Sequence, residues 1–324
     1  MIKIGINGFG RIGRVVLRAI LERYSDQIEV VLINASDSMT QAGWLHLLKH
    51  DSVYGLFSKG VAIPFSFQRD PALIPWQDFG VQVVLECTGA FRNKEALEAH
   101  LRGNNLKVVV SAPAKGVETY VLGVNDQNYQ GAKIISNASC TTNCIAPITK
   151  IVWDNLGIQK AIMSTAHAVT ADQELVDGSN KDWRRARSAL TNVVPTSTGA
   201  AIAVTEVLPM LKGLFGGLAY RVPVSCGSLA DLTLVTTKRT TSEQINEIFT
   251  MAAKNQYKNL VQVTEEQLVS HDIIGNPASA IVDLNLTQVI DGDLVKIVAW
   301  YDNEYGYSCR LVEMALMVIE NDAK

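Results

Sequence analysis

The chain has 324 residues, of which 48% are hydrophobic and 19% are charged, and its formal net charge is -3. This length fits two domains, and the composition excludes intrinsic disorder. The negative charge argues against nucleic acid as the main partner, and no apolar run reaches the roughly 18 residues that a membrane span needs. The N-terminus opens directly into a strand-like segment and the five cysteines form no disulfide pattern, so we expect a cytoplasmic protein.

Apolar segments and helical patterns alternate through the first part of the chain. Helices are expected at 11–24 and 93–103. Strands are expected at residues 2–6, 29–34, 81–89, 107–113, 119–124 and 133–137. The alternation predicts an α/β domain over residues 1–139, with a doubly wound parallel sheet of the Rossmann type.

The sequence pattern changes after about residue 140. Strand patterns rich in β-branched and aromatic residues follow at 161–169, 218–224, 229–240 and 293–302, with longer connections between them. They predict an α+β domain over 140–303 with a mostly antiparallel sheet. The final segment, 304–324, has one apolar helical face, and we expect this helix to pack back on the first domain.

The segment "GINGFGRIGR" holds Gly8, Gly10 and Gly13 between a predicted strand and a predicted helix. In that context G-x-G-x-x-G indicates a dinucleotide site, in which Gly8 makes the turn, Gly10 admits a pyrophosphate and Gly13 allows close helix packing. The helix N-terminus would then face the anion. A plain tight turn is the alternative.

Cys140 lies between a predicted strand and a predicted helix, where a helix N-terminus would lower the pKa of its thiol. A buried packing cysteine is the common alternative. A metal site shared with Cys144 is a further alternative, but no paired His or Cys stands nearby, so no metal is expected. Cys144, one turn later, should enter the core.

A catalytic cysteine needs a base. His46, His50 and His100 lie in segments that we interpret as solvated, and His271 has no assignment. His167 ends an apolar strand and precedes a polar loop, a position where functional sites are often built. It is the candidate base.

Seven motifs occur in the order seen in phosphorylating glyceraldehyde-3-phosphate dehydrogenases. They are "INGFGRIGR", "SAPAK", "SNASCTTNC", "DWRRAR", "PTSTGAA", "RVP" and "WYDNEYGYS". The chain resembles this family from Ile2 to about Glu320. The resemblance implies a homotetramer that oxidises a phosphorylated aldehyde with a nicotinamide cofactor and inorganic phosphate.

The resemblance also implies roles for individual residues. Cys140 would be the nucleophile and His167 the base. Asn303 would bind the nicotinamide carboxamide. Substrate phosphate and inorganic phosphate would be bound by Ser139, Thr141, Thr170, Asp172, Arg185, Thr198, Gly199 and Arg221. The cofactor would be bound by Asn7, Gly8, Gly10, Arg11, Ile12, Gly13, Asn34, Ala35, Ser36, Arg69, Thr88, Gly89, Ser111, Gly178, Ser179, Asn303 and Tyr307.

The chain departs from the family pattern at the strand end "INASDS" and in the "S-loop" at about 171–194. Ala35 stands where an Asp usually binds the adenosine ribose, and Gly178 and Ser179 replace a Leu-Pro pair. An acidic residue would repel the 2′-phosphate of NADP, and alanine removes that repulsion. We expect use of both NAD and NADP. Three further departures are about ten missing residues between Gly55 and Arg69, "HAVT" and "VPVSCGSLADLT". The last two leave Cys140, His167 and Arg221 in place, so we expect an active enzyme.

Several alternatives remain. Erythrose 4-phosphate is a rival substrate, although "TSTGAA" favours a phosphate-using enzyme. Arsenate would fit the site of inorganic phosphate. A catalytically idle protein that uses the dinucleotide fold to bind RNA is disfavoured by the net charge and by the Cys140–His167 pair.

Overall fold

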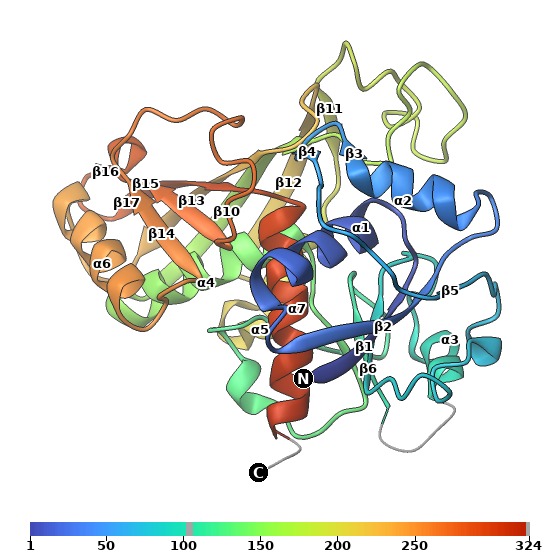
Figure 1. Ribbon diagram of the computed structural model, residues 1–324. Coiled ribbons are helices and arrows are strands. Elements are labelled where there is room, and N and C mark those ends of the chain that lie inside the picture. Colours follow the sequence, from blue (N-terminus) through green and yellow to red (C-terminus); the bar gives the residue numbers. More distant parts are fainter. Residues whose placement is uncertain (102–105, 322–324) are drawn as a thin grey trace. The chain divides into compact units, whose positions relative to one another are not determined.

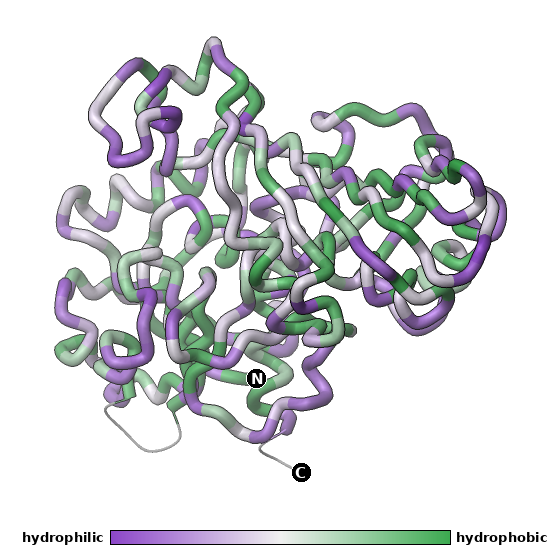
Figure 2. Tube along the Cα trace, turned by 180° about the vertical axis from the view of Figure 1, so that it is seen from behind, coloured by the Kyte–Doolittle hydropathy of each residue, from purple (hydrophilic) through white to green (hydrophobic). Residues whose placement is uncertain are grey.

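Two β-sheets organise the chain in the computed structural model, which describes residues 1–101 and 106–321 (Figure 1). Each sheet belongs to its own compact unit. The first unit comprises Met1–Tyr120, Asp126–Ser139 and Ser308–Lys324, and the second comprises Val121–Asn125 and Cys140–Tyr307. Hydrophobic residues gather along the strands within each unit, and hydrophilic residues gather on the outer loops (Figure 2).

The sheet of the first unit has seven strands in the order β5-β2-β1-β6-β7-β9-β8, and all its pairings are parallel. The strands are β1 (Ile2–Asn7), β2 (Ile28–Asn34), β5 (Phe65–Ser66), β6 (Val83–Glu86), β7 (Lys107–Val110), β8 (Glu118–Thr119) and β9 (Ile134–Ser136). The strand order reverses between β1 and β6, so their carboxyl ends flank the position where doubly wound sheets bind ligands. The predicted parallel sheet is confirmed.

Helices and a short hairpin complete the first unit. They are α1 (Arg11–Ala19) with a π-turn at Ile20–Tyr24, α2 (Gln41–Lys49), β3 (His50–Asp51), β4 (Gly55–Leu56), α3 (Lys94–Leu97) and α7 (Tyr305–Glu320), with 3-10 turns at Pro71–Leu73, Glu98–His100 and Asp126–Asn128. The part of α7 from Ser308 onward belongs to this unit. The last two residues of the helix expected at 93–103, and residues 322–324, lie outside the described residues.

One predicted strand is wrong. Residues 119–124 contribute only Thr119 to β8, and the chain then turns, with the amides of Val124 and Asn125 donating to the carbonyl of Val121. Gly123 takes a φ of +77°, a left-handed conformation that a continuing strand does not allow. An apolar run was therefore not sufficient to identify a strand here.

The second unit contains a mixed, mostly antiparallel sheet in the order β11-β12-β10-β13-β17-β15-β14, with β16 paired to β17. Only the β10–β12 and β14–β15 pairs are parallel. This confirms the predicted α+β class. The strands are β10 (Ile158–Ala168), β11 (Val194–Thr196), β12 (Phe215–Val222), β13 (Ser228–Thr236), β14 (Val261–Thr264), β15 (Ala280–Asp283), β16 (Gln288–Ile290) and β17 (Leu294–Tyr301).

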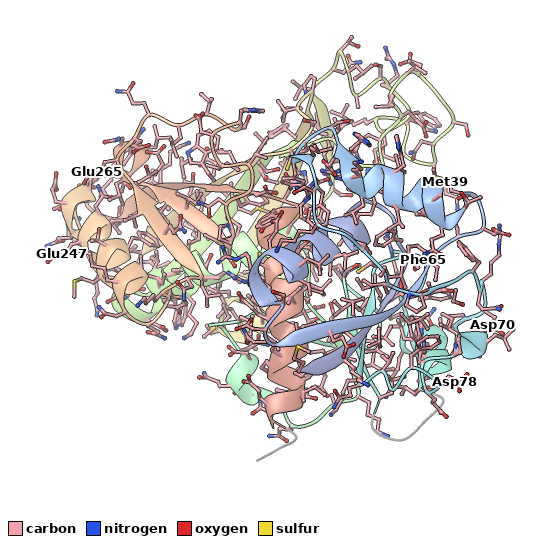
Figure 3. All side chains as sticks on the ribbon, in the orientation of Figure 1. Met39, Phe65, Asp70, Asp78, Glu247 and Glu265 are labelled. Atoms are coloured by element: carbon pink, nitrogen blue, oxygen red, sulfur yellow. The ribbon has the colours of Figure 1, made fainter. Side chains whose placement is uncertain are left out.

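Three helices pack on this sheet: α4 (Cys140–Leu156), α5 (Ala200–Val207) and α6 (Ser242–Lys254), with 3-10 turns at Pro209–Leu211 and Leu284–Leu286. Helix α4 contacts β10, β13, β15 and β17. Alternate residues of β13 are buried, as expected for a strand with one covered face. On α6, Ile245 and Phe249 are buried, whereas Glu247 points outward (Figure 3).

Candidate active site

The glycine turn of the first unit leaves space and donors for an anion. Gly8 takes a φ of +92°, and a Cβ there would lie 2.7 Å from the amide nitrogen of Thr88. A Cβ on Gly13 would lie 2.0 Å from the carbonyl oxygen of Gly8, whereas one on Gly10 would meet no atom within 4 Å. Gly10 is the N-cap of α1, and no side chain caps this end. The turn therefore fits a pyrophosphate on the helix N-terminus.

A buried carboxylate, Glu86, lies beside this turn at the end of β6. Its Oε2 accepts from Asn7 Nδ2 at 2.5 Å and from His100 Nε2 at 3.1 Å. Its Oε1 accepts from the amide of Thr88 at 2.8 Å and from the Thr88 hydroxyl. Trp76 Nε1 donates to His100 Nδ1 at 3.2 Å, which leaves the ring proton on Nε2. Four donors thus converge on one carboxylate.

His100 was predicted to be solvated, and that prediction is wrong: its exposed fraction is 1%. The helical segment that carries it is short, and the histidine closes the buried network between Trp76 and Glu86. His46 and His50 are exposed, as predicted.

The end of β2 holds Asn34 and Ala35. Asn34 Nδ2 donates to Asn7 Oδ1 at 2.8 Å and to the carbonyl of Gln68 at 2.9 Å, so Asn34 joins the Glu86 network. Ala35 is buried, and its amide donates to the carbonyl of Ser66. The next residues, Ser36, Asp37 and Ser38, are exposed.

Two charged residues meet at this exposed end. Arg69 Nη2 lies 2.9 Å from Asp37 Oδ1, and this contact holds the pKa of the Asp37 carboxyl below its usual range. Ser36 and Ser38 are 2.6 Å apart at their hydroxyl oxygens. Asp37 is the acidic residue that follows Ala35 in the sequence, and its carboxylate is engaged with Arg69.

The remaining candidates of the first unit lie around the same strand ends. Arg11 pairs with Asp51 at 2.5 Å, and Ile12 lies in the first turn of α1. Gly89 follows β6 with a φ of +68°, and the amide of Ser111, after β7, donates to the carbonyl of Glu86. The structure therefore gathers the predicted pyrophosphate and adenosine residues of this unit at one edge of its sheet.

In the second unit, Cys140 is the first residue of α4 and His167 stands near the end of β10. Cys140 Sγ lies 3.3 Å from His167 Nε2. Arg221 is paired with His167 across β10 and β12, and its Nη1 lies 2.6 Å from His167 Nδ1 and 3.1 Å from the carbonyl oxygen of Ala168. A thiol, an imidazole and a guanidinium are thus in contact in that order.

His167 Nδ1 has two competing partners, because it also lies 2.7 Å from the carbonyl oxygen of Ala168. Arg221 only donates, so with Arg221 in place Nδ1 accepts and the ring proton sits on Nε2, toward Cys140. If Arg221 moved away, Nδ1 could donate to Ala168, and Nε2 would become an acceptor for the thiol proton. The position of Arg221 therefore selects the tautomer.

Burial dominates the electrostatics of this pair. Burial and, secondly, the charge of Arg221 lower the pKa of His167 to about 3. Burial also raises the pKa of the Cys140 thiol, and the charge of Arg221 offsets only part of that effect. The prediction that the helix N-terminus lowers this pKa is wrong for the chain by itself, which holds a neutral thiol beside a neutral imidazole.

The hydroxyl groups of Thr141, Tyr301 and Thr165 form a hydrogen-bonded chain that begins at the residue after Cys140. Thr165 Oγ1 donates to the carbonyl of Leu229, so Tyr301 must donate to Thr165, at 2.9 Å, and accept from Thr141, at 3.0 Å. The Tyr301 ring packs edge-on against His167, with centroids 6.0 Å apart. Sequence reasoning missed Tyr301, although it lies in the quoted "WYDNEYGYS" motif.

The other anion-binding candidates form separate groups. Arg185 donates to Thr196 through Nε at 2.9 Å and Nη2 at 2.7 Å, and its Nη1 pairs with Asp172. Thr170 donates to Gln173 Oε1 through its amide and its hydroxyl. Within the described chain, neither Thr170 nor Arg185 is hydrogen-bonded to the Cys140–His167–Arg221 group.

Three further candidates, Thr198, Gly199 and Ser139, lie at helix starts. The amide of Ala200 donates to Thr198 Oγ1 at 3.1 Å, and Gly199 is the N-cap of α5. Ser139 directly precedes α4. The Nε of Arg221 is buried with no hydrogen-bond partner among the described residues. Such a group is a candidate donor for an anion, because an unpaired buried donor is costly.

The S-loop contains no helix or strand between residues 171 and 193. Hydrogen bonds and an ion pair join residues within the loop. The amide of Gly178 donates to the carbonyl of Ala186, and Asp177 pairs with Arg187 at 3.0 Å. A Cβ on Gly178 would lie 3.1 Å from Glu174 Oε2. Ser179 and Trp183 are exposed, the latter at 87%.

At the end of β17, Asn303 is buried and its Oδ1 accepts from the amide of Gly227 and the hydroxyl of Ser228. Tyr307, in the first turn of α7, is also buried. Among the described residues, no group of three or more His, Cys, Asp or Glu side chains could hold a metal ion. None of the helices in the described ranges is long and apolar enough to cross a membrane.

Comparisons with known proteins identify the family of the chain. Residues 2–94 match the family model described as glyceraldehyde 3-phosphate dehydrogenase, NAD binding domain, and residues 139–303 match the corresponding C-terminal domain. Glyceraldehyde-3-phosphate dehydrogenases of Streptomyces coelicolor and Mycobacterium tuberculosis are each 46% identical to the chain, with 98% of both sequences covered. One from Bacillus cereus is 46% identical, covering 97% of this chain and 98% of the relative. The chain belongs to the glyceraldehyde-3-phosphate dehydrogenase family.

Proposed function

We propose that the chain oxidises glyceraldehyde 3-phosphate with NAD or NADP and inorganic phosphate, giving 1,3-bisphosphoglycerate. The observation that carries this proposal is the 3.3 Å contact between Cys140 Sγ and His167 Nε2 at the start of α4. The names of the relatives support the substrate. A sulfur nucleophile suits the reaction because it forms a reactive thioester.

Each step can be assigned to the residues of the second unit. Cys140 loses its proton to His167 and adds to the aldehyde carbon, and the new oxyanion takes that proton from His167 to give a hemithioacetal and a neutral imidazole. His167 then removes the hydroxyl proton as the carbon loses a hydride, leaving a thioester on Cys140. Phosphate oxygen attacks the thioester carbonyl, and Cys140 leaves as the thiolate. NAD(P), when bound, supplies the hydride acceptor.

Arg221 couples substrate binding to the base. It contacts His167 Nδ1 at 2.6 Å, and its buried Nε has no partner among the residues that the structure describes. A substrate phosphate that draws the guanidinium toward itself frees Nδ1 to donate to the Ala168 carbonyl. It also removes the charge that lowers the pKa of His167. Nε2 then becomes the stronger acceptor that deprotonation of Cys140 requires.

We assign the phosphates as the family motifs place them. Thr170 and Arg221 donate to the substrate phosphate, and Asp172 of the same motif orients Arg185. Ser139, Thr141, Thr198 and Gly199 bind the inorganic phosphate, for which arsenate is a chemical substitute. Arg185 serves both groups, and its guanidinium is already oriented by Asp172 and Thr196. Hydroxyl and guanidinium donors suit phosphate oxygens.

The strand ends of the first unit fit the cofactor. The open, uncapped turn at Gly10 takes the pyrophosphate, flanked by Asn7, Gly8, Arg11, Ile12 and Gly13. Asn34, Ala35, Ser36 and Arg69 take the adenosine half. Thr88, Gly89 and Ser111 line the remaining strand ends. Asn303 and Tyr307 hold the nicotinamide.

Use of both cofactors rests on the exposed end of β2. Ala35 presents no carboxylate, and Asp37 is paired with Arg69. A 2′-phosphate there would meet the Arg69 guanidinium and the hydroxyls of Ser36 and Ser38, whereas NAD carries no phosphate at this position. Gly178 and Ser179, which replace a Leu-Pro pair of the family pattern, are assigned to the same cofactor preference by the resemblance alone.

The chain is proposed to act as a cytoplasmic homotetramer. Its five cysteines are free, as a reducing compartment requires. Large apolar side chains are exposed on the second unit, among them Trp183, Val193 and Ile162, at 87%, 61% and 56%. Further copies of the chain in a homotetramer would cover such side chains.

A single panel tests the function. Glyceraldehyde 3-phosphate and erythrose 4-phosphate are each supplied with NAD or NADP, and with phosphate, arsenate or neither. We expect the greatest turnover with glyceraldehyde 3-phosphate and phosphate, measurable rates with both cofactors, and arsenate as a working substitute. Erythrose 4-phosphate as the better substrate, or no dependence on the oxyanion, would contradict the proposal.

A further inference from the structure

The departure "VPVSCGSLADLT" lies against Asn303. Asn303 Oδ1 accepts from the amide of Gly227 at 3.1 Å and from the hydroxyl of Ser228 at 2.9 Å, and Cys226 Sγ lies 3.8 Å away. A peptide N–H only donates, so the atom that faces Gly227 must be the amide oxygen. The orientation of the Asn303 amide is therefore defined by its surroundings.

Ser228 is fully buried and has a fixed hydrogen-bonding direction. Its oxygen accepts from the amide of Ala168 at 3.1 Å, which leaves its own proton for Asn303. Ala168 directly follows His167. One hydroxyl thus links the end of the strand that carries the proposed base to the side chain proposed to bind the nicotinamide.

Gly227 supplies its donor through an unusual backbone. Its φ is +85°, and a Cβ at this position would lie 2.0 Å from the carbonyl oxygen of Ser270. No other residue fits there without a shift of the backbone. The glycine thereby brings a second donor to the same oxygen.

The other end of the Asn303 amide has no such partner. Asn303 is buried, with an exposed fraction of 4%. Its Nδ2 nevertheless has no acceptor among the residues that the structure describes. Rotating the amide by 180° would set its hydrogens against the Gly227 and Ser228 donors. The two contacts thus hold Nδ2 as an available donor.

We propose that Ser228 and Gly227 are positioning residues that lock the Asn303 amide, so that Nδ2 donates to the carboxamide oxygen of bound nicotinamide. The inference rests on the proposed function. Ser228 acts only through Asn303, whereas a merely structural serine would affect the whole site. That distinction can be measured by binding, without turnover.

The experiment compares two ligands on four proteins: wild type, Ser228→Ala, Asn303→Ala and the double variant. Calorimetric titration gives the Kd of NAD and of ADP-ribose, which lacks the nicotinamide. We expect NAD to bind about 5-fold more weakly to Ser228→Ala and about 10-fold more weakly to Asn303→Ala and to the double variant. ADP-ribose should change less than about 2-fold in all of them.

A matched control is Thr236→Val. Thr236 ends β13, the strand that begins at Ser228, and its buried hydroxyl donates to the carbonyl of Lys238. It should leave both Kd values unchanged. Additive losses in the double variant, or equal losses for NAD and ADP-ribose, would overturn the proposal. Wild-type protein that binds no NAD would instead remove the proposed function.

Discussion

The Glu86–His100 network of the first unit and the Arg221 and Asn303 side chains of the second unit have their hydrogen bonds satisfied to different degrees. In the first unit, both oxygens of Glu86 accept two donors each, and both ring nitrogens of His100 are engaged. In the second, the Nε of Arg221 is buried without a partner and Asn303 Nδ2 has no acceptor within the described chain. We call a network saturated when all its polar atoms are hydrogen-bonded and unsaturated when some donors have no partner. A saturated network fixes the backbone around it, whereas an unsaturated one keeps donors available for a ligand.

This difference predicts which substitutions affect chemistry and which affect stability. Changes in the unsaturated group should reduce turnover at little cost in folding. Changes in the saturated network should reduce the free energy of unfolding. Four experiments probe this division, and the first has the largest expected effect.

Cys140→Ser should lower kcat by about 1000-fold or more, because a serine hydroxyl beside a neutral imidazole is a far weaker nucleophile. The free energy of unfolding should change by less than about 1 kcal/mol, since the two side chains are nearly isosteric. Steady-state kinetics and urea unfolding measure the two quantities.

Its matched control is Cys144→Ala, one turn along α4, where the thiol is fully buried. That variant should retain activity while losing some stability. If Cys140→Ser kept more than a tenth of the wild-type rate, Cys140 could not be the nucleophile. When the wild-type protein is treated with iodoacetamide, mass spectrometry should find Cys140 modified before the buried thiols.

Glu86→Gln tests the saturated network. Asn7, Thr88 and His100 supply four donor groups, so either placement of the glutamine NH₂ sets it against two donors. The free energy of unfolding should fall by about 3 kcal/mol. Urea denaturation measures this loss. Glu118→Gln is the control, because Glu118 is exposed and accepts one bond from Tyr120. Equal stabilities for the two variants would show that the Glu86 network is not fixed.

The sequence predicted most of what depends on local pattern. Strand and helix alternation gave the parallel sheet, and the context of Gly8, Gly10 and Gly13 gave the phosphate turn. The family motifs brought Cys140, His167 and Arg221 into the candidate site, although their roles remain proposals. These features follow from periodicity and motif order.

Features that depend on contacts distant in sequence were missed. His100 was expected on the surface because its partner Trp76, 24 residues away, has no visible relation to it in the sequence. The two donors to Asn303 Oδ1, Gly227 and Ser228, lie about 75 positions earlier in the sequence. The pKa of Cys140 rises because burial outweighs the helix terminus, and burial is a property of the whole fold.

The next experiment uses pH to test the buried, neutral His167. Its pKa of about 3 when folded lies below the ordinary value of 6.5, so between these values the unfolded chain binds more protons. Stability is therefore complete above about pH 6.5 and falls as the pH drops, by about 2 kcal/mol at pH 5. Urea unfolding at pH 7 and pH 5 measures this loss.

His167→Asn should remove that part of the pH dependence, whereas His46→Asn, at an exposed histidine, should keep it. An unchanged pH dependence in His167→Asn would mean that the imidazole is not held neutral. Since a neutral imidazole is what the base requires before it accepts the thiol proton, this measurement bears on chemistry as well as on folding.

The smallest expected effect lies at the exposed end of β2. Ala35→Asp should lower kcat/KM for NADP by about 10-fold and leave that for NAD within about 2-fold, because a carboxylate repels the 2′-phosphate but accepts ribose hydroxyls. Arg69→Ala should lower only the NADP value, since it removes the cation that pairs with Asp37. Steady-state kinetics with both cofactors separate these cases. Parallel losses with NAD and NADP would mean that the substitutions disturb the whole adenosine site, and cofactor choice would then have to be set elsewhere, with the S-loop pair Gly178 and Ser179 as the next residues to exchange.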